Sequence, residues 1–215
     1  LDWTTPEMLG HKALAVSLSD IAAMGGTSEW ALLSIGIPES LWSSKFLDGF
    51  YEGWHELAAR YDVKLAGGDI SRTPNKLVID STVGGSVAKG EAILRSGAKV
   101  GDSIFVTGPL GGSAAGLRLL NECVGLDKST YDLLVIKQLA PNARVEFGQR
   151  LREIGVVTAM IDLSDGVSSD LAHICRASEV GGVIFANDIP FEAEVMEIAG
   201  SVDAMLDLAL NGGED

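Results

Sequence analysis

Residues 46–69, FLDGFYEGWHELAARYDVKLAGGD, contain the pattern that decides the fold. Aromatic and aliphatic side chains recur along residues 46–61 at intervals of three and four, which predicts an amphipathic helix with one apolar stripe. Residues 63–66 are short and apolar enough for a strand, which would lead directly into Gly67-Gly68-Asp69. A helix followed at once by a strand indicates a domain that contains both kinds of element.

The flanking sequence extends this pattern in both directions. Thr5-Pro6-Glu7 combines an N-cap hydroxyl, a proline at the first helical position and an acid in the first turn, which predicts a helix that ends at Gly25-Gly26. Short apolar runs predict strands at residues 29–37, 77–87, 103–107, 156–161 and 183–185. Periodic apolar residues predict helices at residues 113–124, 142–154, 168–177 and 204–210.

A glycine-containing turn at residues 97–102, GAKVGD, is the best candidate for a domain boundary. The chain of 215 residues is long enough for two modest domains. We therefore expect a first domain over residues 1–95 and a second over residues 96–215.

Composition narrows the classes of partner. Asp and Glu total 30 against 16 Lys and Arg, and this net charge of -14 argues against nucleic acid or an anionic membrane as the main partner, because both attract a basic face. No apolar run reaches about 18 residues, so the sequence predicts no transmembrane helix. The opening LDWTTPEML is not a signal peptide pattern, and Cys123 and Cys175 lie far apart, so we expect a cytoplasmic protein.

Two aspartates in the first half of the chain stand where a carboxylate needs an explanation. The helical neighbours of Asp20 are apolar apart from Ser17, so we expect Asp20 to be buried and either paired, for instance with Lys12, or bound to a metal ion. Asp69 is expected on a tight turn at the end of a strand, where the preceding glycines would let a ligand approach the backbone. An ordinary acidic turn has the same pattern.

Two more aspartates belong to Asp162-Leu163-Ser164-Asp165-Gly166, between an expected strand and an expected helix. Part of this segment could cap the helix, but Asp162 precedes any cap. Two carboxylates about 4 Å apart repel by about 4 kcal/mol at an effective dielectric constant near 20, and a cation between them reverses that sign. With Asp20 and Asp69, these acids are typical of a magnesium site that holds nucleotide phosphates.

Other candidate groups are less specific. Residues 108–116, GPLGGSAAG, lack the ending of a P-loop and the spacing of a dinucleotide loop, which favours a plain strand-to-helix turn. Arg95 could reach a phosphate with its planar fork, or form a surface ion pair. No nucleophile stands in a pattern with a base, so no residue is assigned as a general base.

Five segments, in this order, resemble the thiamine-monophosphate kinase family, which belongs to the superfamily of aminoimidazole ribonucleotide synthetase and selenophosphate synthetase. They are KALAVSLSDIAAMGG (12–26), LAGGDISR (65–72), LRSGAKVGD (94–102), MIDLSDGVSSDLAHICRAS (160–178) and NGGED (211–215). The resemblance covers almost the whole chain. It implies a two-domain α+β fold of the aminoimidazole ribonucleotide synthetase type, with a mixed sheet in the first domain, and transfer of the γ-phosphoryl group of ATP to thiamine monophosphate.

The resemblance also implies roles for particular residues. The magnesium ligands would be Asp20, Asp69, Asp162 and Asp165. The contacts to ATP would be Gly68, Asp69, Arg95, Ser164 and, by a looser match, Tyr51. Glu214 would contact the thiamine substrate. The lack of a general base suits phosphoryl transfer, which depends on positioning and charge neutralisation.

This sequence departs from the family pattern at both ends of the chain. Members of the family carry an acidic segment before the position of Leu1 and further strands after NGGED, so we expect this sequence to be a piece of a longer protein, with an incomplete second domain. The family also forms dimers through the first domain, which implies a homodimer here. The alternatives are another ATP-dependent synthetase of the same superfamily, and a nucleotide-binding or dimerisation fragment without catalysis.

Overall fold

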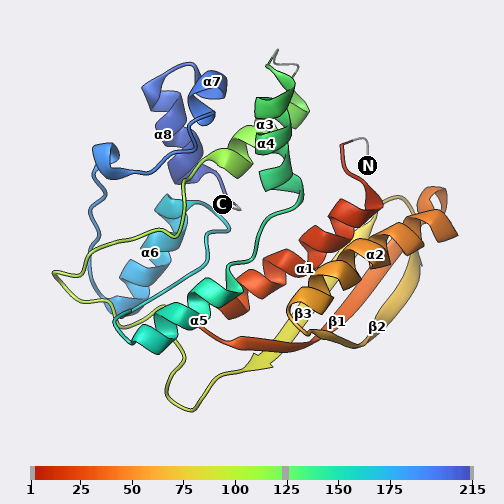
Figure 1. The fold of residues 1–215 in the computed structure, drawn as a ribbon, viewed down its shortest axis with the longest axis horizontal. Coiled ribbons are helices and arrows are strands. Elements are labelled where there is room, and N and C mark those ends of the chain that lie inside the picture. Colours follow the sequence, from red (N-terminus) through yellow and green to blue (C-terminus); the bar gives the residue numbers. More distant parts are fainter. Residues whose placement is uncertain (1–2, 123–125, 214–215) are drawn as a thin grey trace. The chain divides into compact units, whose positions relative to one another are not determined.

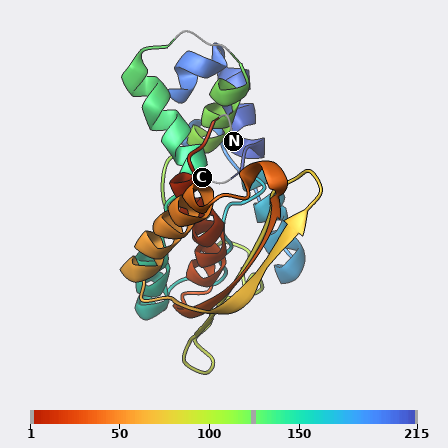
Figure 2. The ribbon, with the colours of Figure 1, turned by 90° about the vertical axis from the view of Figure 1, so that its right-hand side faces the viewer.

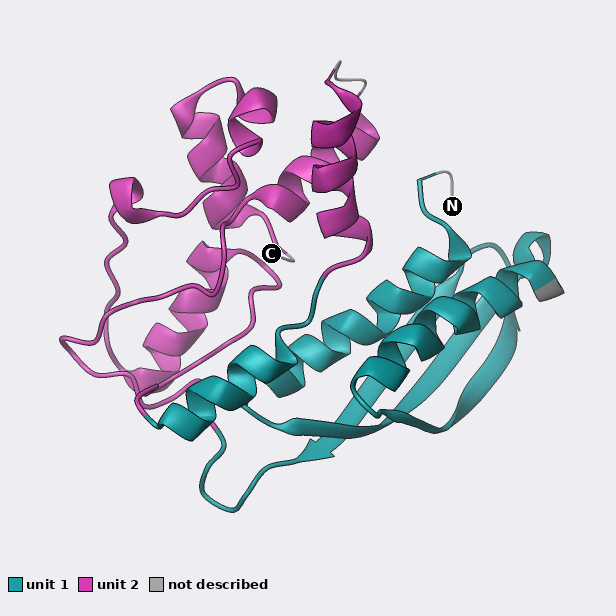
Figure 3. Cartoon of the chain, in the orientation of Figure 1, with its two compact units in different colours: residues 1–92, 142–155 teal, residues 93–141, 156–215 magenta. Residues whose placement is uncertain are grey.

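The computed structural model describes residues 3–122 and 126–213 (Figure 1). The chain forms two compact units, coloured separately in Figure 3. Unit 1 comprises residues 1–92 and 142–155, and unit 2 comprises residues 93–141 and 156–215. The sequence suggested a single division of the chain near residue 96, whereas residues 142–155 return to unit 1.

A mixed three-stranded sheet forms the centre of unit 1. Its strands are β1 (Thr27–Pro38), β2 (Lys64–Thr73) and β3 (Val78–Ser86), in the order β2-β1-β3. β1 pairs with β2 in parallel and with β3 antiparallel. The parallel pair requires a crossover connection, and helix α2 supplies it. The expected α+β class and mixed sheet are confirmed.

Two helices cover one face of this sheet (Figure 2), namely α1 (Pro6–Ala23) and α2 (Ser44–Arg60). The Thr5 hydroxyl accepts a hydrogen bond from the Met8 amide at 3.2 Å, so α1 begins as its capping pattern predicts. The stripe on α2 is also confirmed, because Phe50, Trp54 and Leu57 are almost fully buried. A short 3-10 helix, η1 (Glu39–Leu41), connects β1 to α2.

The opposite face of the sheet is not covered by any helix of unit 1 in the part of the chain that the structure describes (Figure 2). Along β1, Ala31, Leu33 and Ile35 are buried beneath the helices. Trp30 and Leu32 alternate with them and remain 41% and 42% exposed on this open face. A half-covered antiparallel or mixed sheet normally carries polar side chains there, so these two apolar residues require an explanation.

Helix α5 (Val145–Ile154) joins unit 1 by packing against α1. A side chain at Gly148 would collide with the carbonyl group of Ala22, so glycine allows the close approach of the two helices. The Gln149 side chain donates to the Gly26 carbonyl at 3.1 Å, and the Tyr61 hydroxyl donates to the Ala143 carbonyl at 2.9 Å. These long-range contacts explain why residues 142–155 pack in unit 1, although the segments before and after them belong to unit 2.

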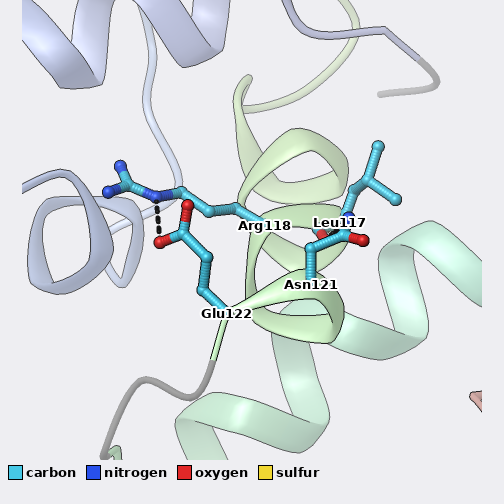
Figure 4. Close-up of polar contacts among 4 residues, drawn as sticks. All are labelled: Leu117, Arg118, Asn121 and Glu122. Carbon is cyan, nitrogen blue, oxygen red and sulfur yellow. Dashed lines mark hydrogen bonds and ion pairs between the residues drawn. The ribbon is translucent and has the colours of Figure 1, made fainter.

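Unit 2 is built from helices in its described residues. They are α3 (Gly112–Asn121), α4 (Lys128–Leu139), α6 (Val167–Ser178), α7 (Val195–Ala199), α8 (Val202–Asn211) and the 3-10 helix η2 (Ala186–Asp188). α4 and α7 were not expected from the sequence. The C-terminal turn of α3 is stabilised by the Arg118–Glu122 ion pair at 3.0 Å and by the Asn121 amide, which donates to the Leu117 carbonyl at 2.9 Å (Figure 4).

The strands expected at residues 103–107, 156–161 and 183–185 do not form. These segments carry strongly exposed apolar side chains, among them Phe105, Val156 and Val183. Apolar and β-branched runs favour a strand only where a neighbouring strand supplies the ladder of hydrogen bonds. The three segments lack such a ladder within the described residues, so the strand prediction was wrong there.

None of the helices in the described residues combines the length and the apolar character that crossing a bilayer requires.

Candidate functional site

Asp69 lies in the middle of β2, opposite Ser34 of β1. The prediction of a tight turn at this position was wrong, because β2 continues through the glycines to Thr73 and keeps its parallel pairing with β1. The Asp69 side chain is exposed on the open face of the sheet, and its carboxylate accepts a hydrogen bond from the Ser71 hydroxyl. The carboxylate is therefore held by a neighbour while remaining open to a ligand.

Gly68 has a backbone conformation that other residues rarely adopt, with φ at 150°. A side chain there would lie against the carbonyl oxygen of Leu33, far inside van der Waals contact. The pairing between β1 and β2 is also irregular nearby, between Ala31 and Leu32. Glycine at this position is thus required by the strand pairing that places Asp69, whether or not Gly68 itself contacts a ligand.

Asp20 lies on an exposed face of α1. The expectation that it is buried was wrong, because α1 buries Leu14, Leu18 and Ala22 and leaves Val16 and other neighbours of Asp20 at the surface. A solvated carboxylate needs no buried partner. Because it is exposed, Asp20 can offer its carboxylate oxygens to a ligand. The cost of burying a charge, however, gives no reason to expect one.

Tyr51 is half-buried on α2, where it packs against the core of unit 1. Its ring stacks on His55 with 5.9 Å between centroids and meets the edge of Phe50 at 5.8 Å. Burial raises the pKa of the Tyr51 hydroxyl above its usual value. The contacts of this ring with its neighbours explain its position without a ligand.

The loop Asp162–Gly166 leads directly into α6 in unit 2. The Ser164 and Asp165 side chains are exposed, and Asp162 is half-buried with an interaction of its own. The expectation of a polar loop before a helix is confirmed, although α6 begins at Val167 and no side chain caps it. The chain thus presents carboxylate and hydroxyl oxygens at the start of a helix.

Asp170 was not singled out from the sequence, yet it is the most buried acid in the described residues, with 2% exposure. Its Oδ2 atom accepts hydrogen bonds from the backbone amides of Ser164 and Asp165, each at 3.1 Å. The signal available in the sequence was an acid in the first turn of α6, which also suits ordinary helix capping.

The loop at residues 162–166 packs against residues 210–213, where the NGGED motif begins. A side chain at Gly213 would collide with the Ser164 carbonyl, and one at Gly166 would lie 2.8 Å from the Leu210 carbonyl. Gly166 also has φ at 97°, which favours glycine. Two motifs that are distant in the sequence are therefore packed together through glycines. Glu214, the expected substrate contact, lies outside the described residues.

Arg95 is exposed in the segment that precedes Gly97. The Ser178 hydroxyl, on the last residue of α6, donates to the Arg95 carbonyl at 3.3 Å. The same oxygen accepts the Gly97 and Ala98 amides at 3.1 Å each. The backbone beside Arg95 is thus tied to α6, and the guanidinium group remains accessible to an anion.

Carboxylate oxygens are the ligands that Mg²⁺ prefers, so the donor set of the four aspartates fits this ion. Within the residues that the structure describes, no three His, Cys, Asp or Glu side chains gather closely enough to hold a metal ion by themselves. Mg²⁺ commonly takes only one or two carboxylates and completes its shell with water and substrate phosphates. Asp20 and Asp69 belong to unit 1, and Asp162 and Asp165 to unit 2.

Comparisons with known proteins agree with both the motifs and the fold. Residues 1–87 match the N-terminal domain of the AIR synthase related proteins, and residues 99–210 match their C-terminal domain. The chain is 42% identical over 217 residues to the thiamine-monophosphate kinase of Bacillus subtilis. That alignment covers 100% of this chain and 65% of the relative, so the chain spans about two thirds of the relative's length.

Solved structures show the same similarity. The thiamine-monophosphate kinase of Stenotrophomonas maltophilia superposes with a TM-score of 0.91 at 37% identity, over 99% of this chain and 66% of that one. AaThiL complexed with AMPPCP and TMP superposes with a TM-score of 0.90 at 32% identity, over 100% of this chain and 68% of that one. This chain therefore belongs to the AIR synthase related family, in the group that contains the thiamine-monophosphate kinases.

Proposed function

We propose that the protein phosphorylates thiamine monophosphate to thiamine diphosphate, with ATP as the phosphoryl donor. The observation that carries this proposal is the 42% identity to a thiamine-monophosphate kinase along the full length of the chain. The AaThiL complex, which holds AMPPCP and TMP, supports the same pair of substrates. The activity is a proposal for the whole protein, of which this chain spans about two thirds of the length of its relatives.

Four carboxylates are proposed to hold magnesium together with the phosphates of ATP: Asp20, Asp69, Asp162 and Asp165. Three of them are exposed and the fourth is half-buried, so the oxygens required for this role are largely accessible. Magnesium, when bound, neutralises the negative charge on the transferring phosphoryl group.

The remaining polar groups are proposed to orient the nucleotide. Arg95 offers a planar, permanently charged fork that matches a phosphate. The Ser164 hydroxyl can donate to a phosphate oxygen, and Gly68 brings the backbone of β2 close to a ligand. Tyr51 is assigned to the neighbourhood of the nucleotide and Glu214 to the thiamine substrate on the sequence resemblance alone.

The chemical step needs no general base. A phosphate oxygen of thiamine monophosphate is already ionised at neutral pH, and its lone pair forms the new bond to the γ-phosphorus of ATP. The bond from that phosphorus to the β,γ-bridging oxygen breaks, and its electron pair leaves on ADP. The task of the protein is then to hold two anionic phosphates in line, which positioning and positive charge accomplish.

We further propose that the protein acts as a homodimer in the cytoplasm. The open face of the unit 1 sheet supports the dimer, because Trp30 and Leu32 are exposed there, and Val78 of β3 is exposed further along the sheet, opposite Gly36. A second copy of this face would cover the apolar side chains of both partners at once. The half-buried free Cys175 suits a reducing compartment.

The first experiment measures thiamine diphosphate formation from thiamine monophosphate and magnesium-ATP, read by conversion to fluorescent thiochrome. It is run on this chain and on a chain extended to the length of the relatives. Product from either chain supports the proposed reaction. Failure of both, with AMPPCP still bound, would indicate another substrate of the superfamily. Failure of both to bind AMPPCP would overturn the nucleotide-dependent function.

Replacement of Asp69 with Asn tests the magnesium role. The variant keeps the size of the side chain and removes its charge, so we expect turnover in an active chain to fall about a hundredfold or more. The matched control is Asp48→Asn on the exposed surface of α2, which should leave turnover unchanged. Unchanged turnover in the Asp69 variant would refute its role.

A further inference from the structure

Helix α6 connects two segments of unit 2 that the proposed function assigns to the nucleotide. Its first turn carries Asp170, and its last residue is Ser178. Both side chains bond to backbone groups of other segments. Asp170 and Ser178 hold these two segments in place, and they are not the residues that are proposed to contact the nucleotide.

Asp170 organises the loop before α6 through a buried charge. One carboxylate oxygen takes two consecutive amides, those of Ser164 and Asp165, at 3.1 Å. A buried carboxylate is stable only when such donors surround it, and bonds to a charged acceptor are stronger than neutral ones. With both amides directed at Asp170, the side chains of Ser164 and Asp165 stay exposed.

Ser178 makes the corresponding contacts at the other end of α6. Its hydroxyl oxygen accepts the amides of Gly97 and Ala98 and donates its proton to the Arg95 carbonyl. One hydroxyl can accept two bonds and donate one, so this group uses its full capacity. Gly97 has φ at 128°, a conformation that favours glycine and that the three bonds hold in place.

We propose that Asp170 and Ser178 are positioning residues, and that α6 sets the spacing between the Ser164–Asp165 loop and the Arg95 segment through them. Asp170 fixes the backbone from which magnesium and phosphate are bound, and Ser178 fixes the backbone of the phosphate-binding arginine. This inference rests on the proposed function for the identity of the ligand. The arrangement of the backbone can be measured without that ligand.

The test of Asp170 compares Asp170→Ala with Asp170→Asn in the full 215-residue chain. Asn keeps an oxygen that can accept both amides, whereas Ala removes it. We expect hydrogen exchange at the Ser164 and Asp165 amides to rise about tenfold or more in the Ala variant and to rise clearly less in the Asn variant, whose neutral oxygen accepts weaker bonds. The magnesium concentration that supports half-maximal AMPPCP binding should rise in the same order, most in the Ala variant.

The test of Ser178 uses Ser178→Ala. The Gly97 and Ala98 amides should exchange faster, and the dissociation constant for AMPPCP should rise several-fold, while the magnesium midpoint stays unchanged. Asp132→Asn on α4 and Ser103→Ala are exposed controls of the same chemistry and should change none of these quantities. Thermal unfolding of each variant separates a general loss of stability from the local effects.

The outcomes test the positioning role of α6 and the proposed function separately. If wild type binds magnesium-AMPPCP and the Ala variants bind it equally well, α6 has no positioning role and this inference is overturned. The same holds if the Asn and Ala variants of Asp170 behave alike. If neither this chain nor the extended chain binds nucleotide but the four amides open as expected, the backbone anchors stand and the proposed function fails.

Discussion

At the scale of single residues, the structure separates glycines required by the backbone from those that only leave space. Gly67 and Gly68 are adjacent in β2, but only Gly68 has a positive φ and a neighbouring carbonyl in the place of a side chain. A side chain at Gly67 would meet only Leu32 Cδ2, at an ordinary 3.6 Å. The sequence pair Gly-Gly conceals this difference, which depends on β1.

Replacement of Gly68 with Ala should therefore destabilise the protein, whereas replacement of Gly67 should not. We expect Gly68→Ala to lower the free energy of unfolding by about 1–3 kcal/mol, the typical cost of forcing a side chain into a glycine-only conformation. Gly67→Ala removes conformational freedom from the unfolded chain and should be neutral or slightly stabilising. Urea denaturation of both variants measures the difference, and equal stabilities would contradict the strain argument.

At the scale of elements, helix α4 shows how a capping residue can mark a helix that the apolar pattern does not reveal. Its apolar residues run consecutively in LLVI at residues 133–136, so no single stripe is evident. Its start is nevertheless clear, because Asp127 Oδ1 accepts the Ser129 amide at 2.9 Å and the Thr130 amide at 3.1 Å. The hydroxyl groups of Ser129 and Thr130 and these amides hold the pKa of Asp127 well below its usual range.

The lowered pKa of Asp127 predicts a pH dependence of stability. A group with a depressed pKa in the folded state stabilises the protein above its unfolded pKa, near 3.8, and that contribution is lost as the pH falls toward the folded pKa. Asp127→Asn keeps the cap without the charge. The stability gap between wild type and this variant should therefore be larger at pH 7 than at pH 3.

Urea denaturation at the two pH values checks this expectation. Asp132→Asn, on the exposed side of the same helix, serves as the control and should show a much smaller change in the gap. A gap for Asp127→Asn that is the same at pH 7 and pH 3 would contradict the assignment of the ionised carboxylate as the cap.

At the scale of the whole molecule, each unit exposes apolar surface that its own helices do not cover. In unit 1 this surface is the open face of a sheet, with Trp30 and Leu32 in its central strand. In unit 2 it follows the extended segments around Phe105, Val156 and Val183. Contiguous exposed apolar surface normally marks a contact with other protein, and Trp30 and Leu32 are neighbours on the open face of β1.

A homodimer through the open face should be sensitive to a charge at its centre. Leu32→Lys places an ammonium group where the proposed contact is apolar, so we expect a monomer at micromolar concentrations where wild type is a dimer. Light scattering gives the mass directly. Met24→Lys, at an equally exposed apolar residue beside α1, should remain dimeric. A wild-type monomer, or a dimer that survives Leu32→Lys, would rule out this interface.

Much of the fold followed from local patterns, and much of the site did not. The caps and stripes of α1 and α2 act within a few residues, so the sequence predicted them well. The burial of Asp20 was mispredicted, because the face of α1 that packs inward is chosen by α2, α5 and the sheet. Asp69 was placed on a turn because the pairing that extends β2 depends on β1, about 35 residues earlier.

The sequence by itself determined the family, the α+β class and the aspartates proposed to bind magnesium, because motifs and periodicity are properties of short segments. Only the tertiary structure decided that Asp170 and Ser178 hold these segments, and that three apolar runs in unit 2 do not form strands. The physical reason is the same in each case. A hydrogen bond or a strand pair needs a partner, and the partners lie on residues that only folding brings together.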